Sequence, residues 1–310
     1  MAIAACLGML LLSSAATKTP IRYQSYNLPS SIVHTLAIPP ESHLAVSVAL
    51  SPELDEIENF ARKHQAIAVL NGGFFDPVNH KTTSYIVQQG QIVADPRLNE
   101  RLIHNPKLAP YMDRILNRSE FRRYQCGSTI RYEISLHSAA IPAGCELVDA
   151  VGGGPRLLPE LTSVQEGFFD VKHGKIIQDA IGSQQPNART AIGITRDRNI
   201  IWVMVAQKPE LSKSGMSLPA LAQFMKSLGV EQAINLDGGS SSALYYQGKT
   251  FYGKVNAQRK TVKRPIKSVL ILKELPITHY PLPKKFIPSF LTHESNIALK
   301  RSLDSDAIQR

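Results

Sequence analysis

The chain has 310 residues, of which 43% are hydrophobic and 19% are charged, and its formal net charge at pH 7 is +10. This is globular composition, long enough for one large domain or two small ones, and the positive charge favours acidic ligands such as phosphates or anionic glycans. Nucleic acid is not an expected partner, because the basic residues are spread over 97–123 and 254–267 without a zinc-finger, helix-turn-helix or RNA-binding aromatic signature.

The N-terminal segment reads as a targeting signal. Residues 1–16 are apolar, too short to span a bilayer comfortably, and end in small residues. We therefore expect a signal peptide at 1–17, export to the extracellular space or periplasm, and no stable membrane span after cleavage. The usual positive start is missing, and the box ending in Cys6 resembles a lipoprotein cleavage site, so lipidation of Cys6 stays open. Residues 18–43 are polar and proline-punctuated, which predicts a linker.

Residues 44–274 are predicted to form a single catalytic domain of the mixed α/β (α+β) class, with mixed sheets and a few helices. A helix is expected to begin with Ser51 as its N-cap and Pro52 in its first turn. A second helix is expected at 217–228, with Gly229 as its stop. The expected strands are 45–50, 66–70, 85–87, 91–94, 200–206, 232–236, 243–246, 250–252 and 268–272. Residues 275–310 are expected to form a tail outside the core.

Residues 96–147 are polar, arginine-rich and weakly periodic, which predicts an insertion or lid. They hold Cys126 and Cys145, the two cysteines that remain after signal cleavage. In an oxidising compartment this pair predicts a disulfide that closes a loop of about 20 residues and stabilises the fold by roughly 3 kcal/mol. Two buried free thiols are the alternative. The histidines show no pair at metal-ligand spacing, so we expect no zinc site.

One pattern occurs four times along the chain: a buried strand ends in glycines, and a polar or charged residue is presented there. These residues are Asn71 and Asp76, Arg156, Arg189, and Asp237. The most informative copy is 235–242, where Asp237 follows an apolar strand and precedes two glycines and three serines. Each copy alone is equally consistent with a turn, in which Asp237 only caps the chain. Four copies together favour a shared cleft, since glycines let a ligand approach backbone N–H groups.

The four segments, in this order and spacing, resemble the phosphodiester glycosidase family. The resemblance covers roughly Leu44 to Leu272, with Ser240 where the family usually has a third glycine and Ala188 where it usually has a proline. The predicted insertion at 96–147 has no counterpart in the family pattern, so the substrate of other family members cannot be assigned to this chain. The matching segments are Asn71-Gly72-Gly73-Phe74-Phe75, Gly152-Gly153-Gly154-Pro155-Arg156-Leu157-Leu158, Arg189-Thr190-Ala191-Ile192-Gly193 and Asn235-Leu236-Asp237-Gly238-Gly239.

The resemblance implies hydrolysis of the glycosidic bond of a sugar-1-phosphodiester to a free sugar and a phosphomonoester. Such a leaving group has a second pKa of about 6 and needs little protonation, so cations for the phosphate and one carboxylate at the anomeric side suffice. Asp237 is the first candidate for nucleophile or base and Asp76 the second. Asn71 would orient a sugar hydroxyl or water, and Arg189 and Arg156 would hold the phosphate. The other expected substrate-binding residues are Gly153, Gly154, Thr190, Gly238, Gly239 and Ser241.

Three further alternatives stay open. A hard divalent cation, Ca²⁺ or Mg²⁺, held by Asp237, Asp76 and backbone carbonyls is an alternative to a site without metal. The substrate is alternatively an exopolysaccharide or wall glycan without phosphate. Finally, the chain is alternatively a non-catalytic glycan-binding protein of the same fold, although the retained Asp237, Arg189 and Asn71 speak against this.

Overall fold

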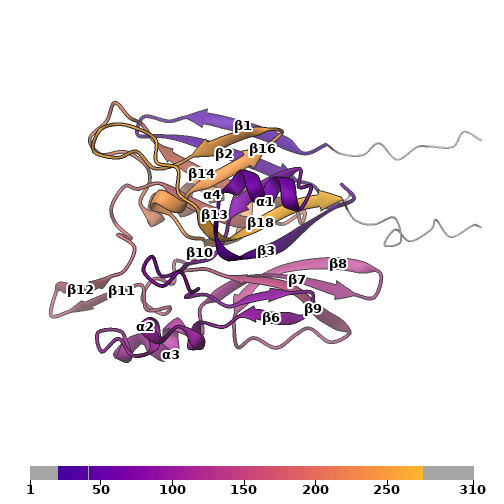
Figure 1. Cartoon of the computed structure of the whole chain (residues 1–310), viewed down its shortest axis with the longest axis horizontal. Coiled ribbons are helices and arrows are strands. Elements are labelled where there is room, and N and C mark those ends of the chain that lie inside the picture. The colour runs from indigo at the N-terminus through magenta and orange to yellow at the C-terminus, as the bar shows by residue number, and fades with distance from the viewer. Residues whose placement is uncertain (1–19, 41, 275–310) are drawn as a thin grey trace, which may run out of the picture. The chain divides into compact units, whose positions relative to one another are not determined.

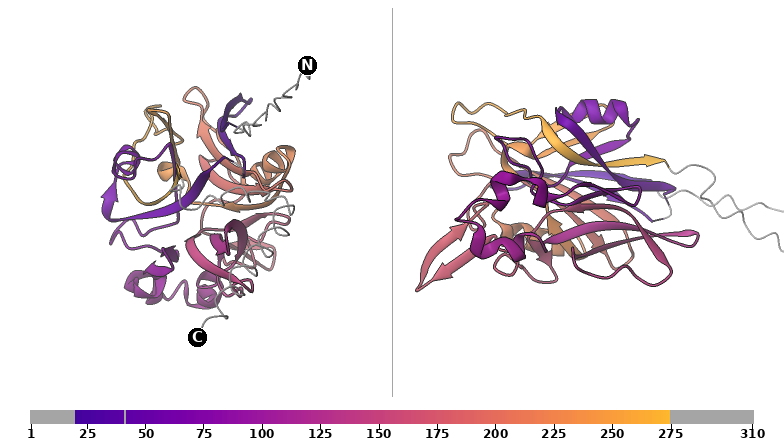
Figure 2. Two further views of the ribbon diagram at one scale, coloured as in Figure 1. Left: turned by 90° about the vertical axis from the view of Figure 1, so that its right-hand side faces the viewer. Right: turned by 60° about the horizontal axis from the view of Figure 1, so that its bottom comes forward.

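The computed structural model describes residues 20–40 and 42–274, which form three β-sheets, a separate hairpin and a few short helices (Figures 1 and 2). The chain thus forms the predicted single domain of strands and helices, and strands predominate in it. All strand pairings between the described residues are antiparallel, so the sheets are not mixed in direction as predicted. The predicted signal peptide, Cys6 and the predicted tail lie outside the described residues.

Each of the three sheets joins strands from distant parts of the chain, so their spatial order differs from their order in the sequence. The first sheet consists, from edge to edge, of β1 (Arg22–Asn27), β2 (Ser31–Ile38), β14 (Ile200–Gln207), β13 (Arg189–Thr195), β15 (Val230–Asn235) and β10 (Arg156–Leu158). The second consists of β17 (Lys249–Tyr252), β16 (Ala243–Tyr246), β4 (Ala68–Asn71), β18 (Ile266–Glu274) and β3 (Leu44–Asp55). The third consists of β6 (Gln91–Ala94), β5 (Ile86–Gln88), β9 (Cys145–Gly152), β7 (Ser119–Cys126) and β8 (Thr129–Leu136). The separate hairpin pairs β11 (Phe169–Lys172) with β12 (Lys175–Asp179).

Two of the helices cover sheet faces, because each carries one apolar stripe. Helix α4 buries Leu218, Leu221 and Met225 with residues of the first sheet. Helix α1 packs Ile57 and Phe60 with residues of the second sheet. The helices and helical turns are α1 (Ile57–Lys63), η1 (Pro96–Leu98), α2 (Glu100–Ile103), η2 (Ala109–Tyr111), α3 (Met112–Ile115), α4 (Leu218–Ser227) and η3 (Gly239–Ser241).

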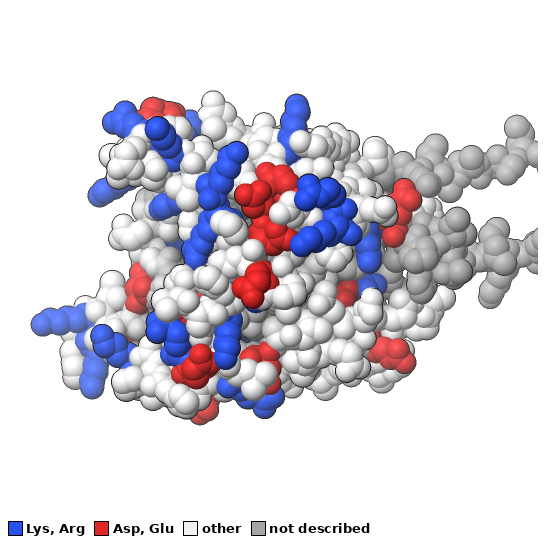
Figure 3. All heavy atoms as spheres, in the orientation of Figure 1, with Lys and Arg blue, Asp and Glu red and all other residues white. Residues whose placement is uncertain are grey.

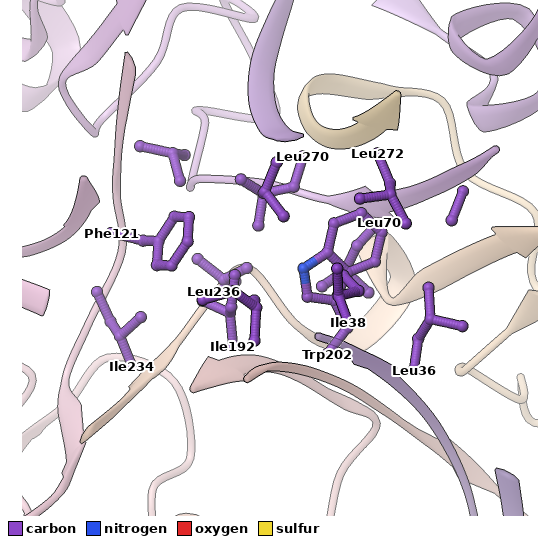
Figure 4. Packing of buried hydrophobic residues seen from close by; sticks show 14 of the residues in the cluster. Leu36, Ile38, Leu70, Phe121, Ile192, Trp202, Ile234, Leu236, Leu270 and Leu272 are labelled. Atoms are coloured by element: carbon purple, nitrogen blue, oxygen red, sulfur yellow. The ribbon is translucent and has the colours of Figure 1, made fainter. Parts of the chain in front are cut away.

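One hydrophobic core joins all three sheets. Leu36 comes from the first sheet, Leu70 from the second and Phe121 from the third, and all three are fully or almost fully buried in the same cluster (Figure 4). Trp202 lies in this cluster and is fully buried, so it is a core residue. Leu236 also points into the core, which makes Asp237 the first residue beyond it.

The predicted linker is corrected by the structure, because residues within 18–43 form two strands of the first sheet. Strand β2 pairs with β14 over its whole length and buries Val33, Leu36 and Ile38, while β1 pairs with β2 at the edge of the sheet. The polar residues and prolines that suggested a linker lie mainly in β1 and the flanking turns. The run 31–38, rich in apolar and β-branched residues, was the signal for a strand.

The predicted start of the first helix is also wrong. Strand β3 continues to Asp55, because this stretch pairs with β18, and the helix begins only at Ile57. The Asp55 carboxylate accepts hydrogen bonds from the Glu56 amide at 2.9 Å and from Asn59 at 2.6 Å, which supports the first turn of α1. Tertiary strand pairing thus overrides a local Ser-Pro capping pattern.

Residues 96–147, predicted as an insertion or lid, form the short helical turns η1, α2, η2 and α3 and then enter the third sheet. Strands β7 and β8 form a hairpin, and β7 pairs on its other side with β9. The predicted disulfide between Cys126 and Cys145 is present, and it links residues directly opposite each other on β7 and β9. The bond therefore closes one end of this sheet.

The surface carries its charge in dispersed form. Figure 3 shows lysine and arginine side chains over several elements of one face, with aspartate and glutamate between them. No helix among the described residues has the length and apolar character needed to cross a membrane.

Candidate active site

The four junctions predicted from the sequence meet in the structure. Main-chain hydrogen bonds connect the segment after β15 to the ends of β4 and β13, and β15 itself to the glycines after β9. The bonds run from the Asp237 amide to the Gly72 carbonyl (3.0 Å), from Leu236 to Thr190 (2.8 Å), from Gly239 to Ala188 (2.9 Å) and from Gly154 to Asn235 (2.7 Å). The four segments are therefore neighbours in the fold, and the shared cleft that the repeated pattern favours stays a prediction.

Asn71, the last residue of β4, holds this arrangement together with its side chain. It is fully buried; its Nδ2 donates to the Asp237 carbonyl oxygen at 2.6 Å, and its Oδ1 accepts from Thr190 Oγ1 at 2.7 Å and from the Ala243 amide at 3.0 Å. Asn71 and Thr190 are thus brought together with Asp237, as predicted. Asn71 contacts the main chain of Asp237 directly, while Thr190 holds the Asn71 side chain and accepts from the Leu236 amide, so both influence where the carboxylate is presented.

Asp237 has a perturbed carboxylate. The residue is partly buried, and its Oδ1 accepts a hydrogen bond from the Gly238 amide at 2.9 Å. Burial raises the pKa of Asp237 to about 6, while the nearby Ser241 hydroxyl, the Arg264 charge and the Gly238 amide act in the opposite direction. A carboxylate with such a pKa exchanges its proton close to neutral pH, as catalytic carboxylates do.

Arg264 is the cation near Asp237 that the sequence interpretation missed. Its NH1 donates to Ser240 Oγ at 2.9 Å, and its guanidinium carbon lies 4.8 Å from the ring centroid of Phe75. Arg264 lies just before β18, the strand that pairs with β4 and thus with Asn71. The sequence feature that could have identified Arg264 is the basic stretch 254–267, which runs into this strand. Ser240, where the family usually has glycine, supplies a contact that glycine cannot make.

Arg189 lies near the junction, but its guanidinium binds backbone carbonyl groups. The side chain is 2% exposed and donates to the carbonyl oxygens of Met216 (3.0 Å), Ile181 (2.9 Å), Gly182 (2.6 Å) and Gln185 (3.0 Å). Burial lowers the pKa of Arg189 to about 10, so it stays charged at neutral pH. These contacts hold the loop before β13 and the entry to α4 in place.

Asp76 is engaged elsewhere. Its Oδ2 accepts from Arg101 Nε at 2.9 Å and its Oδ1 from the Val78 amide at 2.7 Å. Burial alone would raise the pKa of Asp76, but these hydrogen bonds and the Arg101 charge outweigh it and lower the pKa. Within the described parts of the chain no three His, Cys, Asp or Glu side chains gather around a common point. The predicted cation between Asp237 and Asp76 stays a prediction.

The glycines after β9 are required by close packing. A Cβ on Gly153 would lie 2.6 Å from the Asn235 carbonyl oxygen, and Gly154 has a φ of +111°. Arg156, which follows them, contacts Glu160 through NH2 at 3.3 Å, while its buried Nε has no hydrogen-bond partner among the described residues. Gly153 and Gly154 thus let β10 approach β15.

The amides of Gly238 and Gly239 are both used within the protein, by the Asp237 carboxylate and by the Ala188 carbonyl oxygen. The hydroxyls of Ser241 and Ser242 differ, because both are buried without a hydrogen bond of normal geometry in the described chain. Unsatisfied buried polar atoms are uncommon in native proteins and often mark functional sites. These two hydroxyls follow Asp237 closely in the sequence.

Known proteins resemble this chain in sequence and in fold. The family model described as phosphodiester glycosidase matches residues 64–273, which include all four junctions. No curated protein sequence matches the chain.

Solved structures share the fold. The catalytic domain of zebrafish N-acetylglucosamine-1-phosphodiester alpha-N-acetylglucosaminidase, auto-inhibited by its pro-peptide, is 19% identical with a TM-score of 0.59, and the match covers 83% of each chain. A hypothetical protein from Synechocystis is 18% identical with a TM-score of 0.54, over 81% of this chain and 61% of that one. A protein of Burkholderia pseudomallei K96243 described as a candidate exported protein is 18% identical with a TM-score of 0.54, over 79% and 74%.

Proposed function

Because this chain belongs to the phosphodiester glycosidase family, we propose that it hydrolyses the glycosidic bond of a sugar-1-phosphodiester. The products are a free sugar and a phosphomonoester. The activity in the name of the zebrafish neighbour supports this reaction class. The enzyme acts after export, in a compartment where the Cys126–Cys145 disulfide persists.

The observation that carries the proposal is the carboxylate of Asp237. It stands at the end of β15, it is partly buried, and its pKa of about 6 places its ionisation near neutral pH. Asp237 acts at the anomeric carbon as nucleophile or base, which requires the ionised form. The Gly238 amide and the Arg264 charge favour that form. Because the departing phosphate has a pKa of about 6, a strong general acid is not needed.

The surrounding residues act by holding this carboxylate in position. Asn71 fixes the main chain of Asp237, Thr190 fixes the Asn71 side chain, and Arg189 fixes the loop beside them through carbonyl contacts. Positioning of this kind contributes to catalysis because small displacements of a reacting group are costly. Asp76, bound to Arg101, orients the loop that follows β4.

Three substrates test the proposal: a sugar-1-phosphodiester, an aryl α-glycoside and an intact polysaccharide. Phosphomonoester, phenol and reducing ends are measured for the wild type, for Asp237→Asn and for Asp76→Asn. We expect phosphomonoester release by the wild type, its loss in folded Asp237→Asn protein, and substantial retention in Asp76→Asn. Near-normal activity of Asp237→Asn would remove Asp237 from catalysis. Release of reducing ends from the polysaccharide, without release of phosphomonoester, would show that the substrate is a glycan without phosphate.

A further inference from the structure

We propose that the β11–β12 hairpin docks the protein on a membrane surface that contains anionic phospholipids. The contact is peripheral, since the hairpin enters the headgroup layer without crossing the bilayer. The residues that carry the proposal are Val171, Lys172, Lys175, Ile176 and Ile177. None of them belongs to the candidate active site, so membrane docking stands independently of the proposed function.

The hairpin projects from the three sheets and is covered by none of them (Figures 1 and 2). Its two strands pair only with each other, and residues 171–177 are all exposed. His173 and Gly174 form the two-residue turn, with φ of +51° and +74°. A two-stranded ribbon without a packed face gains little stability from folding. Packing within the domain therefore does not explain which side chains stand at the end of this hairpin.

One face of the ribbon is aliphatic. Val171 and Ile176 are direct cross-strand partners, and Ile177 is the extra residue of the bulge beside them. Their side chains are 46%, 60% and 52% exposed, respectively. Directly opposed residues share one face of a ribbon, so Val171 and Ile176 lie together. Exposed aliphatic residues that gather at one place mark interaction surfaces, whereas single ones are ordinary.

The opposite face carries two lysines beside the turn. Lys172 and Lys175 are also direct cross-strand partners, and neither forms an ion pair within the described part of the chain. Both acids of the hairpin, Asp170 and Asp179, lie at its base, where each accepts a hydrogen bond from a residue outside the hairpin. Like charges directly opposite each other destabilise a ribbon. An anionic partner beside the turn would relieve this repulsion.

The combination of aliphatic and basic side chains favours a lipid surface over other anionic partners. A soluble polyanion would use the lysines and leave the aliphatic face in water, whereas the boundary between headgroups and acyl chains takes up aliphatic side chains. A second copy of this chain would bring the same lysines and a formal net charge of +10. Figure 3, drawn in the orientation of Figure 1, shows basic side chains at the end where the hairpin projects.

The two faces can act on a membrane at the same time. The aliphatic face enters the acyl boundary, and the lysines of the other face remain within a Debye length of the lipid phosphates. Basic residues on the polar face of interfacial amphipathic helices contribute to binding in the same way. The hairpin thus matches an anionic bilayer in both polarity and charge.

Cosedimentation of the full chain with vesicles tests membrane docking. One set of vesicles contains phosphatidylcholine alone, and the other contains equal parts of phosphatidylcholine and phosphatidylglycerol. We expect binding to the mixed vesicles that weakens as salt is added, and binding to the neutral vesicles that is at least about tenfold weaker. Absence of binding to the mixed vesicles, or equal binding to both sets, would overturn the proposal.

Two double variants separate the hairpin lysines from the overall charge. Lys172→Gln with Lys175→Gln should weaken binding to the mixed vesicles at least about tenfold, since one lysine near an anionic surface contributes a factor of about five. The control is Lys226→Gln with Lys249→Gln, which removes the same charge from exposed positions on α4 and β17. It should stay within about twofold of the wild type. Equal weakening in the two variants would assign binding to net charge and refute a role of the hairpin.

A second pair of variants tests the aliphatic face. Ile176→Ser with Ile177→Ser keeps every charge and should also weaken binding at least about tenfold. The control is Ile92→Ser with Val93→Ser, because these side chains are 55% and 41% exposed on the β5–β6 hairpin, which has no lysine or arginine. It should bind as the wild type does. Unchanged vesicle binding in Ile176→Ser with Ile177→Ser, matched by binding of dextran sulfate, would indicate a soluble polyanion and contradict a lipid contact.

The hairpin variants should fold, since every substituted residue is exposed. Circular dichroism and thermal unfolding check this. Hydrolysis of a water-soluble sugar-1-phosphodiester should be the same in the wild type and in the hairpin variants. A wild type that binds the mixed vesicles but hydrolyses no phosphodiester would uphold membrane docking and refute the proposed function instead.

Discussion

Asp237→Asn should make the protein more stable at neutral pH while removing its activity. The ionised carboxylate is held in a partly buried position, and its pKa is raised from 3.8 to about 6. Since one pKa unit corresponds to about 1.4 kcal/mol, the folded state loses about 3 kcal/mol at pH 8 through this group. Asparagine is isosteric, can still accept the hydrogen bond of Gly238, and carries no charge.

The sign follows from proton linkage. Because the folded pKa lies above the unfolded one, the folded state binds more protons between about pH 4 and pH 6, and wild-type stability falls as the pH rises through this window. The advantage of Asp237→Asn over the wild type should therefore be small at pH 4 and should grow by about 2 kcal/mol towards pH 8. Urea unfolding of both proteins at a series of pH values measures this difference. The other titrating groups are the same in both proteins, so their contributions cancel when the two free energies of unfolding are subtracted.

Asp76→Asn is the control with the opposite sign. The pKa of Asp76 is lowered in the folded state by the Val78 amide and Arg101, although burial opposes them. Its carboxylate thus stabilises the fold above the unfolded pKa. The Asp76→Asn variant should therefore be less stable than the wild type at neutral pH, and its stability should approach that of the wild type as the pH falls.

A difference in stability between Asp237→Asn and wild type that does not change with pH would refute the pKa assigned to Asp237.

Three other outcomes are expected. The acid limb of kcat/KM should lie near pH 6 and move to higher pH in Arg264→Met, because this charge lowers the pKa of Asp237; an unmoved limb would exclude that coupling. Arg189→Met should lower the midpoint of thermal unfolding by several degrees and reduce activity equally on phosphodiesters and aryl glycosides, since it leaves four carbonyl groups unpaired; a loss confined to phosphodiesters would instead assign it to phosphate. Replacing Cys126 and Cys145 together by serine should cost about 3 kcal/mol in urea unfolding, since they are 19 residues apart; equal stability under oxidising conditions would contradict this.

Local sequence patterns predicted several elements because the apolar runs and capping residues that mark those elements lie within the segments themselves. Strand β4 is a short apolar run that ends in Asn71, and β15 ends in a buried apolar pair before Asn235. Helix α4 begins after Ser217, whose hydroxyl accepts from the Ala220 amide. The predictions that were wrong concern segments whose conformation depends on a distant partner. Strand β2 needed β14, and the extension of β3 through Ser51 needed β18.

The role of each arginine was beyond the reach of sequence patterns. A guanidinium has the same composition whether it is open to a ligand or binds backbone carbonyl groups, as that of Arg189 does. The distinction depends on which loops end beside it. Arg264 illustrates the same point, because it approaches Asp237 only through the pairing of β18 with β4.

Neighbouring residues alone establish that Asp237 ends an apolar strand before glycines and hydroxyls, and that three similar junctions precede it. These features are visible in the sequence because they need no distant partner. The groups that surround the carboxylate are known only from the folded chain: Asn71 on its main chain, Arg264 near its charge and Arg189 turned towards carbonyl oxygens. Burial, hydrogen bonding and the field of nearby charges arise between segments that are far apart in the chain, so no local pattern encodes them.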